Sequence, residues 1–524
     1  MPSPTLTSRA APRALLARRA GLRSPARGGG RAEQPHGGQT STWVLLAICC
    51  LAQFMVVLDV SIVNVALPQM RDALGLSVVG QQWVVNAYTL SFAGFLLLGG
   101  RAADLFGRKR TFLGGLGLFV ASSLLGGVAQ SGAWLILARA SQGLGGAVLA
   151  PATLTLVTTH FVEPEARRRA LGAWSATAAS GAAIGVLLGG VLTQVLDWRW
   201  VLFVNVPIGA ILLVVAAFAL QESRGGADRA SLDLPGALAV TAGLAVVVYG
   251  IVGTDTRPWG SPRTLVSLAL GGALLAAFLV IEARVARHPL VPLGVFRRRG
   301  LAAANAMAVM IGAAMFGTFF FLSLYVQQIN HYSALRAGFA FLPMGLAVLT
   351  GALTGTRLLA LLGLRRQLVL GPALAGGGLV WLTRLAPGAG YWPHLFGPMI
   401  MVGLGLGLSF VPMTMAATSG VPSHQAGLAS GLINTTRQVG GAIGLALMAT
   451  VAAAAAHGSS SPASALALTA GYDRAFVLAA VALAVGAGLA LLLPPPGGAR
   501  QPEARDRRLP PGEAQGNLDD VRAA

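Results

Sequence analysis

The sequence has little charge, two cysteines and a single lysine. Of its 524 residues, 55 % are hydrophobic and 11 % are charged, whereas a soluble globular chain carries about 25 % charged residues. So little charge cannot cover a surface that faces water, and a soluble protein is therefore excluded. Lys109 is the only lysine, and no G-x-x-x-x-G-K-[ST] segment occurs, which excludes an ATP-driven pump within this chain.

Catalytic and metal-binding patterns are also absent from the sequence. It contains no H-E-x-x-H, C-x-x-C or G-x-S-x-G segment, so no class of enzyme has support. Cys49 and Cys50 are adjacent in an apolar run, and because neighbours on a helix point in different directions they form no metal or redox pair. The sequence predicts neither a cofactor nor a metal ion.

Long apolar runs separated by short polar segments dominate the chain. About 20 apolar residues cross the ~30 Å hydrocarbon core of a bilayer as a helix, whereas the strands of a membrane barrel alternate in polarity, which these runs do not. We therefore predict an all-α membrane protein. Fourteen spans are expected, at 43–67, 82–100, 111–129, 133–158, 168–193, 200–221, 234–253, 264–283, 301–327, 335–361, 367–385, 393–418, 426–452 and 474–493.

The distribution of basic residues predicts the orientation. With the N-terminus inside, the inner loops and tails hold roughly four times as many basic residues as the outer loops, as the positive-inside rule requires. An even number of spans then places both termini in the cytoplasm, in the cytoplasmic (inner) membrane. The net charge of +20 lies in loops and tails rather than on one folded face, so nucleic-acid binding is not expected.

Both ends of the chain are polar and are expected to be disordered tails, over residues 1–41 and 494–524. The first is basic and has no short apolar stretch followed by a cleavage site, so it does not resemble a signal peptide. A start codon placed too far upstream is an alternative explanation for it.

An internal repeat divides the part of the chain between the two tails. Arg101 and Gly107 have the same spacing as Arg357 and Gly363, and basic residues follow in both cases. The strings "GAAIG" (181–185) and "GGAIG" (440–444) each follow a glycine nine residues earlier. A duplicated helical half is typical of secondary transporters, with the substrate site between the halves. We expect a six-helix half over 42–222, two linker helices over 233–284 and a second six-helix half over 300–493.

Several segments are informative because they occur together and in a fixed order: "LDVSIVNVALP" (58–68), "GRAADLFGRKR" (100–110), "LILARASQG" (135–143), "DWRWVLFVNVPIG" (197–209), "DLPG" (233–236), "YSALRAG" (332–338) and "GLASGLINTTRQVGGAIG" (427–444). Over roughly 43–493 the chain resembles the major facilitator superfamily, specifically its fourteen-span drug:proton antiporters. The resemblance implies two six-helix halves plus two extra central helices. It also implies proton-coupled efflux of hydrophobic or amphipathic small molecules such as antibiotics.

The sequence departs from that family at three positions. Val186 stands where the fifth span of the antiporters usually has proline, and Ala102 and Leu105 replace the usual Leu and Arg of the loop. The bend that this proline produces is a feature of the antiporters. Because Val186 replaces it, a proton-coupled nutrient symporter remains an alternative. A non-transporting scaffold or sensor is a second alternative, and such a protein would not need an acid inside a span.

Asp59 is the acid that falls well inside a predicted span; the other seventeen lie in tails, loops or span ends. An ionised carboxylate in a membrane is costly unless it is paired or faces water, and one that a proton can neutralise is a usable proton carrier. Arg139 in the fourth span is the matching cation, and the pair would have to weaken when Asp59 takes a proton. The alternative is a static pair that holds the half together.

Other polar or aromatic residues within spans are candidates for a substrate cavity: Asn64, Trp83, Asn86, Gln142, Tyr325, Asn434, Arg437 and Gln438. Asn434 and Gln438 are four residues apart and share a helical face, and Arg437 beside them would suit an anionic group of the substrate. Having two intramembrane arginines favours neutral or anionic compounds over dications. A hydrogen-bonded cluster in the bundle interior is an equally good explanation for the Asn434 group.

The loop at 100–110 is expected to gate the cytoplasmic side. Asp104 would cap a helix end across the interface, Gly100 and Gly107 would permit tight turns, and Arg108 and Lys109 would also serve topology. The antiporter-motif helix carries a small-residue face at Gly181, Gly185, Gly189 and Gly190, which allows close helix packing. The expected partners are a small-molecule substrate, protons and the lipid bilayer, with the monomer as the working unit and the proton gradient as the energy source.

Overall fold

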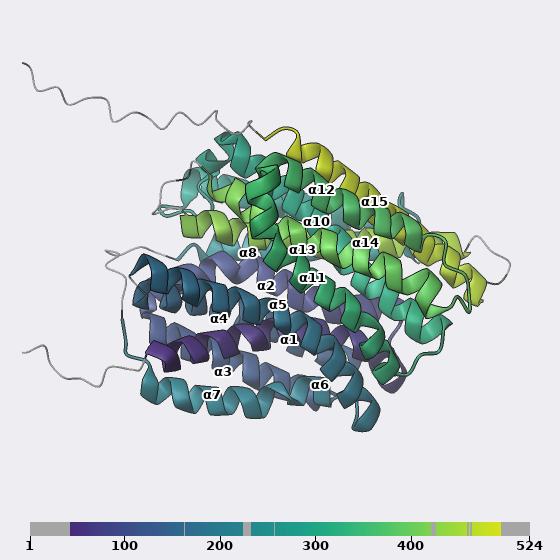
Figure 1. Ribbon diagram of the computed structural model, residues 1–524, viewed down its shortest axis with the longest axis horizontal. Coiled ribbons are helices and arrows are strands. Elements are labelled where there is room, and N and C mark those ends of the chain that lie inside the picture. Colours follow the sequence, from purple (N-terminus) through teal and green to yellow (C-terminus); the bar gives the residue numbers. More distant parts are fainter. Residues whose placement is uncertain are drawn as a thin grey trace, which may run out of the picture. The chain divides into compact units, whose positions relative to one another are not determined.

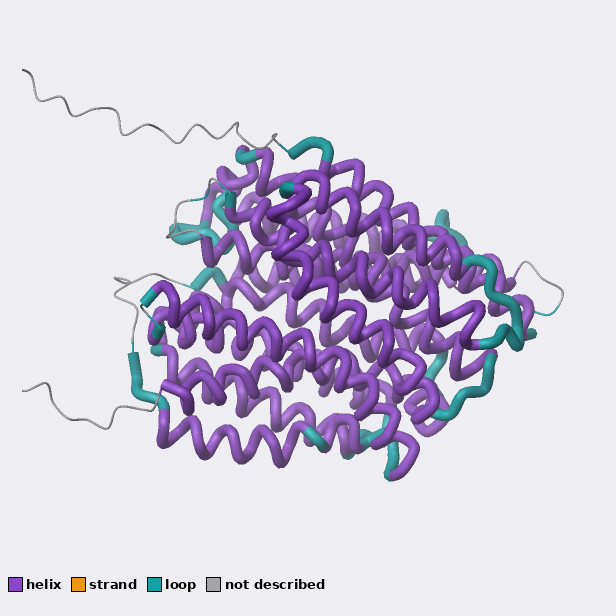
Figure 2. Tube along the Cα trace, in the orientation of Figure 1, coloured by secondary structure: helices purple, strands orange, loops and turns teal. Residues whose placement is uncertain are grey.

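The computed structural model describes residues 42–161, 163–223, 232–255, 257–419, 421, 426–457, 461 and 464–493. Both predicted tails, 1–41 and 494–524, lie outside the described residues. Every regular element in the described part is a helix, and no strand occurs there (Figure 2). The prediction of an all-α protein is confirmed.

The helices follow the predicted spans in order. Their bounds are α1 Thr42–Leu74, α2 Val78–Phe106, α3 Arg108–Gly127, α4 Gly132–His160, α5 Pro164–Val195, α6 Trp200–Phe203, α7 Asn205–Ala219, α8 Leu234–Val252, α9 Pro262–Val280, α10 Arg299–Leu324, α11 Ala334–Leu362, α12 Leu364–Leu382, α13 Gly397–Thr418, α14 Ala426–His457 and α15 Ala465–Ala490. Short 3₁₀ or π segments adjoin them: η1 Gly253–Asp255, η2 Ile281–Val285, η3 Leu293–Arg297, η4 Tyr325–Ile329 and η5 Trp392–Phe396.

Twelve spans in the described residues are long and apolar enough to cross a membrane. The predicted spans at 168–193 and 367–385 correspond to α5 and α12, which are not among the twelve. Both helices begin beside arginines and contain many glycines, which lowers their hydropathy; a shorter apolar stretch, Ala183–Val195, remains in α5. The chain is a multi-pass membrane protein, and the count of fourteen spans stays a prediction.

Several boundaries differ from the predicted ones, and local reasons account for two of the differences. The sixth span is divided into α6 and α7, because Pro207 has no N–H to continue the helix across Val204. The last helix begins at Ala465 rather than at 474, since the Ser464 side chain accepts a hydrogen bond from the N–H of Ala467 and starts the helix there. Asp473 therefore lies within α15, which corrects its placement at a span end.

The internal repeat is visible in the packing. Helices α1 to α7 form one group and α10 to α15 another, and the contacts α1–α5, α2–α4 and α3–α4 of the first recur as α10–α14, α11–α13 and α12–α13 of the second (Figure 1). Gly107 joins α2 to α3 at a φ of 100°, and Gly363 joins α11 to α12 at a φ of 76°. L-residues with side chains rarely adopt such angles. The matched glycines mark equivalent turns in the two halves.

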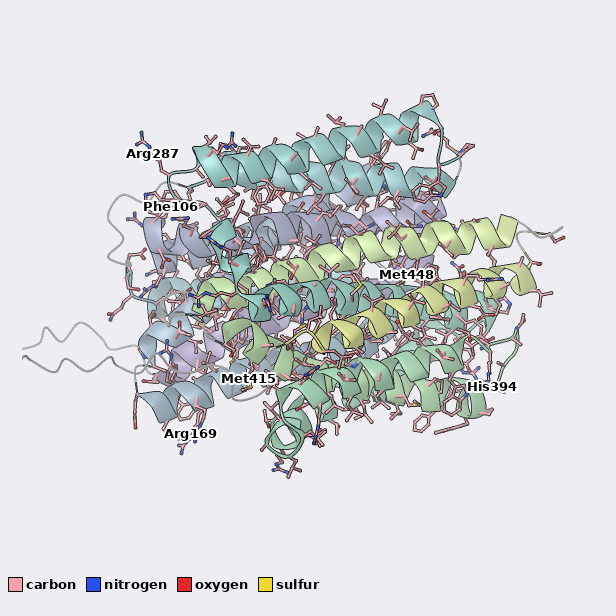
Figure 3. The ribbon with its side chains drawn as sticks, turned by 90° about the horizontal axis from the view of Figure 1, so that it is seen from above. Phe106, Arg169, Arg287, His394, Met415 and Met448 are labelled. Carbon is pink, nitrogen blue, oxygen red and sulfur yellow. The ribbon has the colours of Figure 1, made fainter. Side chains whose placement is uncertain are left out.

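The helix bundle has two ends, which labelled residues distinguish. Phe106, Arg169 and Arg287 lie at one end and His394 lies at the other (Figure 3). We call the end with Phe106, Arg169 and Arg287 the loop end, and the end with His394 the far end. Near the far end, Ser323 Oγ on α10 donates a hydrogen bond to the carbonyl of Asn64 on α1 (2.9 Å), and this bond joins the two halves.

Of the two linker helices, α9 packs on α8, and α8 packs against both halves where they contact each other. Helix α8 contacts both α2 of the first half and α14 of the second, and α2 and α14 also contact each other. Thr450 on α14 donates a hydrogen bond to the carbonyl of Ile251 on α8 (3.1 Å). The linker pair thus lies on one side of the contact between the halves.

Candidate functional site

Asp59 and Arg139 form an ion pair inside the first half. Arg139 Nη1 lies 2.5 Å from Asp59 Oδ2, and the two side chains are 2 % and 0 % exposed, with Asp59 the fully buried partner. Asp59 comes from the middle of α1 and Arg139 from α4. The proximity expected from the sequence is confirmed, whereas the role of the pair in proton coupling stays a prediction.

Three further side chains complete the environment of the Asp59 carboxylate. Gln142 Nε2 on α4 and Asn205 Nδ2 on α7 donate to Asp59 Oδ1, at 2.8 and 3.0 Å. The same two amide nitrogens lie 3.1 Å from Ser123 Oγ on α3. The Ser123 hydroxyl in turn donates to the carbonyl of Leu202 (2.9 Å). Asp59 therefore accepts hydrogen bonds from α4 and α7, and all of these groups are buried.

Arg139 has partners besides the carboxylate. Its Nη1 donates to Gln142 Oε1 (2.7 Å) and its Nε to the carbonyl of Val84 on α2 (3.3 Å). The guanidinium carbon lies 4.4 Å from the centre of the Tyr88 ring, in cation–π geometry. Five helices of the first half thus meet at one charged centre that is closed to solvent.

The chemistry open to this centre follows from its charge balance. The pair is neutral overall, and its hydrogen bonds satisfy the carboxylate while it is ionised. A proton on Asp59 would leave Arg139 as an uncompensated buried cation, which is costly in a membrane interior. The observed arrangement therefore suits the ionised carboxylate.

Asn205 and Ser123 are parts of this centre that sequence reasoning did not identify. Both are polar residues within apolar helices, which was the available signal. Both residues are far from Asp59 along the chain, so the sequence gave no reason to connect either with that carboxylate. Only the packing of the helices brings the three side chains together. Tyr88 and the carbonyl of Val84 likewise reach Arg139 only through the fold.

The residues predicted for the substrate cavity do not form one group. Gln142 belongs to the Asp59 centre. Trp83 packs with the apolar side chains that α8 and α14 bring against α2. Tyr325 is fully buried in the second half, where its hydroxyl donates to the carbonyl of Ala386 (2.7 Å). Asn64 donates to the carbonyl of Val60 (2.9 Å) within α1.

Asn86 and Gln438 are the remaining buried members of that set. Asn86 is 0 % exposed, and neither its amide oxygen nor its amide nitrogen has a hydrogen-bond partner in the described part of the chain. Gln438 lies on α14 and is 7 % exposed. Buried amides without partners are rare in native interiors, so Asn86 is the stronger of these two candidates for contact with a bound molecule.

The predicted gate loop 100–110 is helical except at Gly107, because α2 continues to Phe106 and α3 begins at Arg108. It is fastened to the first half and the linker. Arg101 Nη1 donates to the carbonyls of His288 and Pro289, at 2.8 and 3.0 Å. Lys109 Nζ donates to the carbonyl of Ala217 (2.6 Å). The backbone N–H of Arg108 donates to the carbonyl of Ser223 (3.0 Å).

Glu222, rather than Asp104, caps a helix at this loop. Its two carboxylate oxygens accept the backbone N–H groups of Lys109 and Arg110, at 3.2 and 3.3 Å, at the start of α3. A carboxylate is favourable at a helix N-terminus because of the exposed N–H groups there. Asp104 has no hydrogen-bond or ion-pair partner among the described residues, so its predicted capping role has no contact in this conformation. Gly100 lies within α2, which corrects its predicted place at a turn, and an added Cβ there would be 3.6 Å from Pro151 on α4.

The glycines of the antiporter-motif helix divide between two neighbours. A Cβ on Gly181, Gly185 or Gly189 would lie within 3.2 Å of a carbonyl oxygen of α1, in the same half. A Cβ on Gly190 would lie 2.5 Å from the carbonyl of Ala334 on α11, in the other half. Helix α5 runs unbroken through Val186. Gly190 is therefore the member of this set that lies at the contact between halves.

Gly190→Val is expected to reduce transport at least tenfold. The added side chain has no room against Ala334, and overpacking of this kind costs about 1–3 kcal/mol, which would hold the halves apart near the far end. Gly172→Val on the same helix is the matched control, because nothing lies within 4 Å of a Cβ there. Transport and thermal melting of both variants are measured. Equal transport by the two variants would contradict the prediction.

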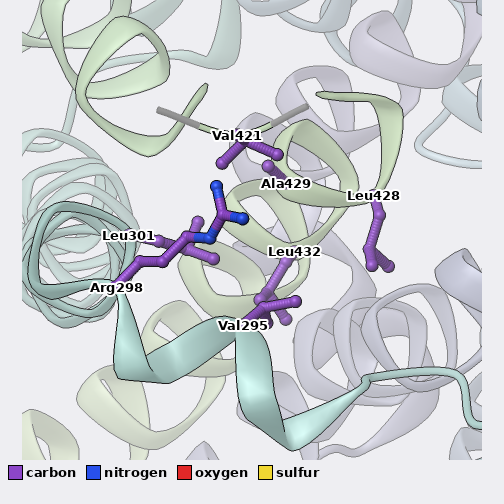
Figure 4. Close-up of a pocket in the computed structure, with 7 residues that line it drawn as sticks. All are labelled: Val295, Arg298, Leu301, Val421, Leu428, Ala429 and Leu432. Atoms are coloured by element: carbon purple, nitrogen blue, oxygen red, sulfur yellow. The ribbon is translucent and has the colours of Figure 1, made fainter. Parts of the chain in front are cut away.

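A small apolar pocket opens at the loop end of the second half. It is lined by Val295, Arg298, Leu301, Val421, Leu428, Ala429 and Leu432. The Arg298 side chain extends across it toward Val421 and Ala429 (Figure 4). None of its residues belongs to the Asp59 centre, and we assign it no role.

The fold and the charged centre together define the class of protein. Two packed helical repeats in a multi-pass membrane chain, with a closed ion pair inside one of them, are features of secondary transporters. The family model for the Major Facilitator Superfamily matches residues 49–445, and the chain belongs to that superfamily. It is therefore a membrane transporter and not an enzyme.

Known relatives agree with this assignment, and a solved structure agrees with the fold. The cephamycin export protein CmcT of Amycolatopsis lactamdurans is 44 % identical over 89 % of this chain and 94 % of its own length. The puromycin resistance protein pur8 of Streptomyces alboniger is 41 % identical, over 86 % of this chain and 91 % of its own. Among solved structures, a bacterial homologue of the lysosomal transporter Spinster, inward-facing and unoccupied, matches with a TM-score of 0.60 at 16 % identity, covering 86 % of this chain and 96 % of that one.

Proposed function

We propose that this protein exports hydrophobic or amphipathic small molecules, such as antibiotics, across the cytoplasmic membrane in exchange for protons. The names of the relatives support export and resistance as the activity. The observation that carries proton coupling is the Asp59–Arg139 pair, a carboxylate and a guanidinium cation closed away from solvent in the middle of the first half. The proposal includes fourteen spans, cytoplasmic termini and a working monomer.

The proposed cycle uses the two charge states of this centre. A proton that reaches Asp59 from the outside neutralises it and frees Arg139 from its counter-charge. Arg139 then depends on Gln142, the Val84 carbonyl and the Tyr88 ring, which together compensate the charge less well than a carboxylate does. Rearrangement of α1 against α4 relieves that cost, and the two halves rock about the substrate between them. Loss of the proton to the cytoplasm restores the pair.

The contacts of the gate loop 100–110 attach it firmly to its own half and to the linker pair. Arg101 binds the segment that follows α9, and the Glu222 cap ties α3 to the end of α7. The loop would therefore move as one body with the first half and the linker pair. In this proposal Gly100, Asp104, Gly107, Arg108 and Lys109 form the cytoplasmic gate when the loop approaches the second half.

Efflux from energised cells tests the proposed function. Cells that express the protein are loaded with a test panel of cephamycin, puromycin and a lipophilic fluorescent dye, and retention is followed before and after an uncoupler collapses the proton gradient. We expect faster loss of at least one compound than in cells without the protein, and the uncoupler should abolish the difference. Uptake rather than loss, driven by the same gradient, would replace export with symport.

A further inference from the structure

The second half contains a guanidinium group that no acid neutralises. Arg437 lies in the middle of α14 (Ala426–His457), a membrane-length helix. None of the ion pairs in the described part of the chain includes it, whereas Arg139 is paired with Asp59. A charged side chain within a span is costly without a partner, and such residues usually mark a substrate or ion pathway.

The contacts of Arg437 are neutral ones. Its Nη2 donates to Asn434 Oδ1 (2.7 Å), one turn earlier on the same helix. The guanidinium carbon lies 5.2 Å from the centre of the Phe410 ring on α13. Its Nε is buried and has no hydrogen-bond partner in the described part of the chain. The side chain as a whole is partly exposed, so a bound molecule has access to it.

The repeat indicates that this charge is not required by the packing of the helix. The glycines that fit α14 against α10, Gly440 and Gly444, correspond to Gly181 and Gly185 of α5 against α1. By the same correspondence Arg437 stands where the first half has Ala178. The equivalent helix is thus built without a cation at that position.

We propose that Arg437 binds an anionic group, most simply the carboxylate, of an amphipathic substrate, with the Phe410 ring beside it as an apolar surface. The inference rests on the proposed function and adds the substrate class. Arg139 does not serve in this way, since it is 2 % exposed and already bound to Asp59. A carboxylate can accept two parallel hydrogen bonds from a guanidinium group, and the Nε–H and an Nη–H of Arg437 provide such a pair when Asn434 gives way.

Binding to the purified protein tests this site without any proton gradient. The probes are 4-(1-pyrenyl)butyrate and its methyl ester, which share an apolar body and differ in charge. Energy transfer from the protein's tryptophans to pyrene reports binding in lipid nanodiscs. We expect the wild type to bind the carboxylate at least tenfold more tightly than the ester. Arg437→Gln should remove that preference by weakening carboxylate binding alone, and Arg437→Lys should retain part of it.

Three results would overturn the proposal. These are no binding of the carboxylate by the wild type, an unchanged preference in Arg437→Gln, and an equal loss for both probes, which would indicate a structural role. Thermal melting of each variant identifies one that has failed to fold, and Asn434→Ala then serves as the second variant. It removes the competing acceptor and should strengthen carboxylate binding. Failure of proton-coupled export would leave these binding results unchanged, so the two proposals fail separately.

Discussion

Asp59→Asn is expected to abolish accumulation against a gradient while leaving substrate binding and downhill exchange intact. The amide has nearly the shape of the protonated carboxyl, so the variant resembles the neutral state that the cycle must visit. It cannot lose a proton, and it therefore cannot return to the ion pair with Arg139. One proton moving down a pH difference of one unit provides about 1.4 kcal/mol, enough for a concentration ratio of about tenfold. In the variant that ratio should fall to one.

Asp72→Asn is the matched control for this experiment. Asp72 lies on the same helix, is exposed and has no hydrogen-bond or ion-pair partner among the described residues. Proteoliposomes with an imposed pH gradient provide the ratio, and exchange of labelled substrate without a gradient provides the second readout. Accumulation by Asp59→Asn equal to that of Asp72→Asn would contradict the assignment of Asp59 as the proton site.

The double variant Asp59→Asn/Arg139→Gln is expected to be stable but inactive in gradient-driven export. Arg139→Gln alone leaves a buried carboxylate without its cation, and removing one partner of a buried pair costs about 3–5 kcal/mol. Replacing both removes the uncompensated charge, and Gln142 and Asn205 can still donate to the amide oxygen that takes the place of the Asp59 carboxylate. The two substitutions should therefore be strongly non-additive in thermal melting.

This pair of measurements separates coupling from a structural role. If Asp59 and Arg139 only hold α1 and α4 together, the double variant should recover export along with stability. If the pair carries the proton cycle, stability returns without accumulation. Recovery of both in the double variant would contradict the account.

The sequence predicted the helices and the repeat because those features are local or periodic. Apolar runs predict spans wherever they occur, and the matched glycines Gly107 and Gly363 indicate equivalent turns without knowledge of the packing. Asp59 and Arg139 were identifiable because ionised groups are so rare within spans. Their contact followed from placing α1 and α4 in the same half.

Other parts of the site could not be predicted because they depend on which faces of the helices meet. Asn205 reaches Asp59 only because α7 packs on α1. Glu222 caps α3 from the end of α7, across a long separation in sequence. Trp83 and Tyr325 are amphipathic aromatic residues of the kind that line substrate cavities. In the structure, however, Trp83 lies at the contact with the linker helix α8, and Tyr325 lies in the core of the second half. The residue type therefore indicates a candidate for a functional site, but it does not indicate which side chains that residue contacts.

Proton movement driven by substrate is the most direct test of the central claim. Proteoliposomes that contain a pH-sensitive dye and the purified transporter are given a gradient of an exported compound and no pH gradient. We expect protons to move opposite to the compound with the wild type and the Asp72→Asn control, and to stay still with Asp59→Asn. Substrate flux through the wild type without any proton movement, or equal proton movement with Asp59→Asn, would contradict the account.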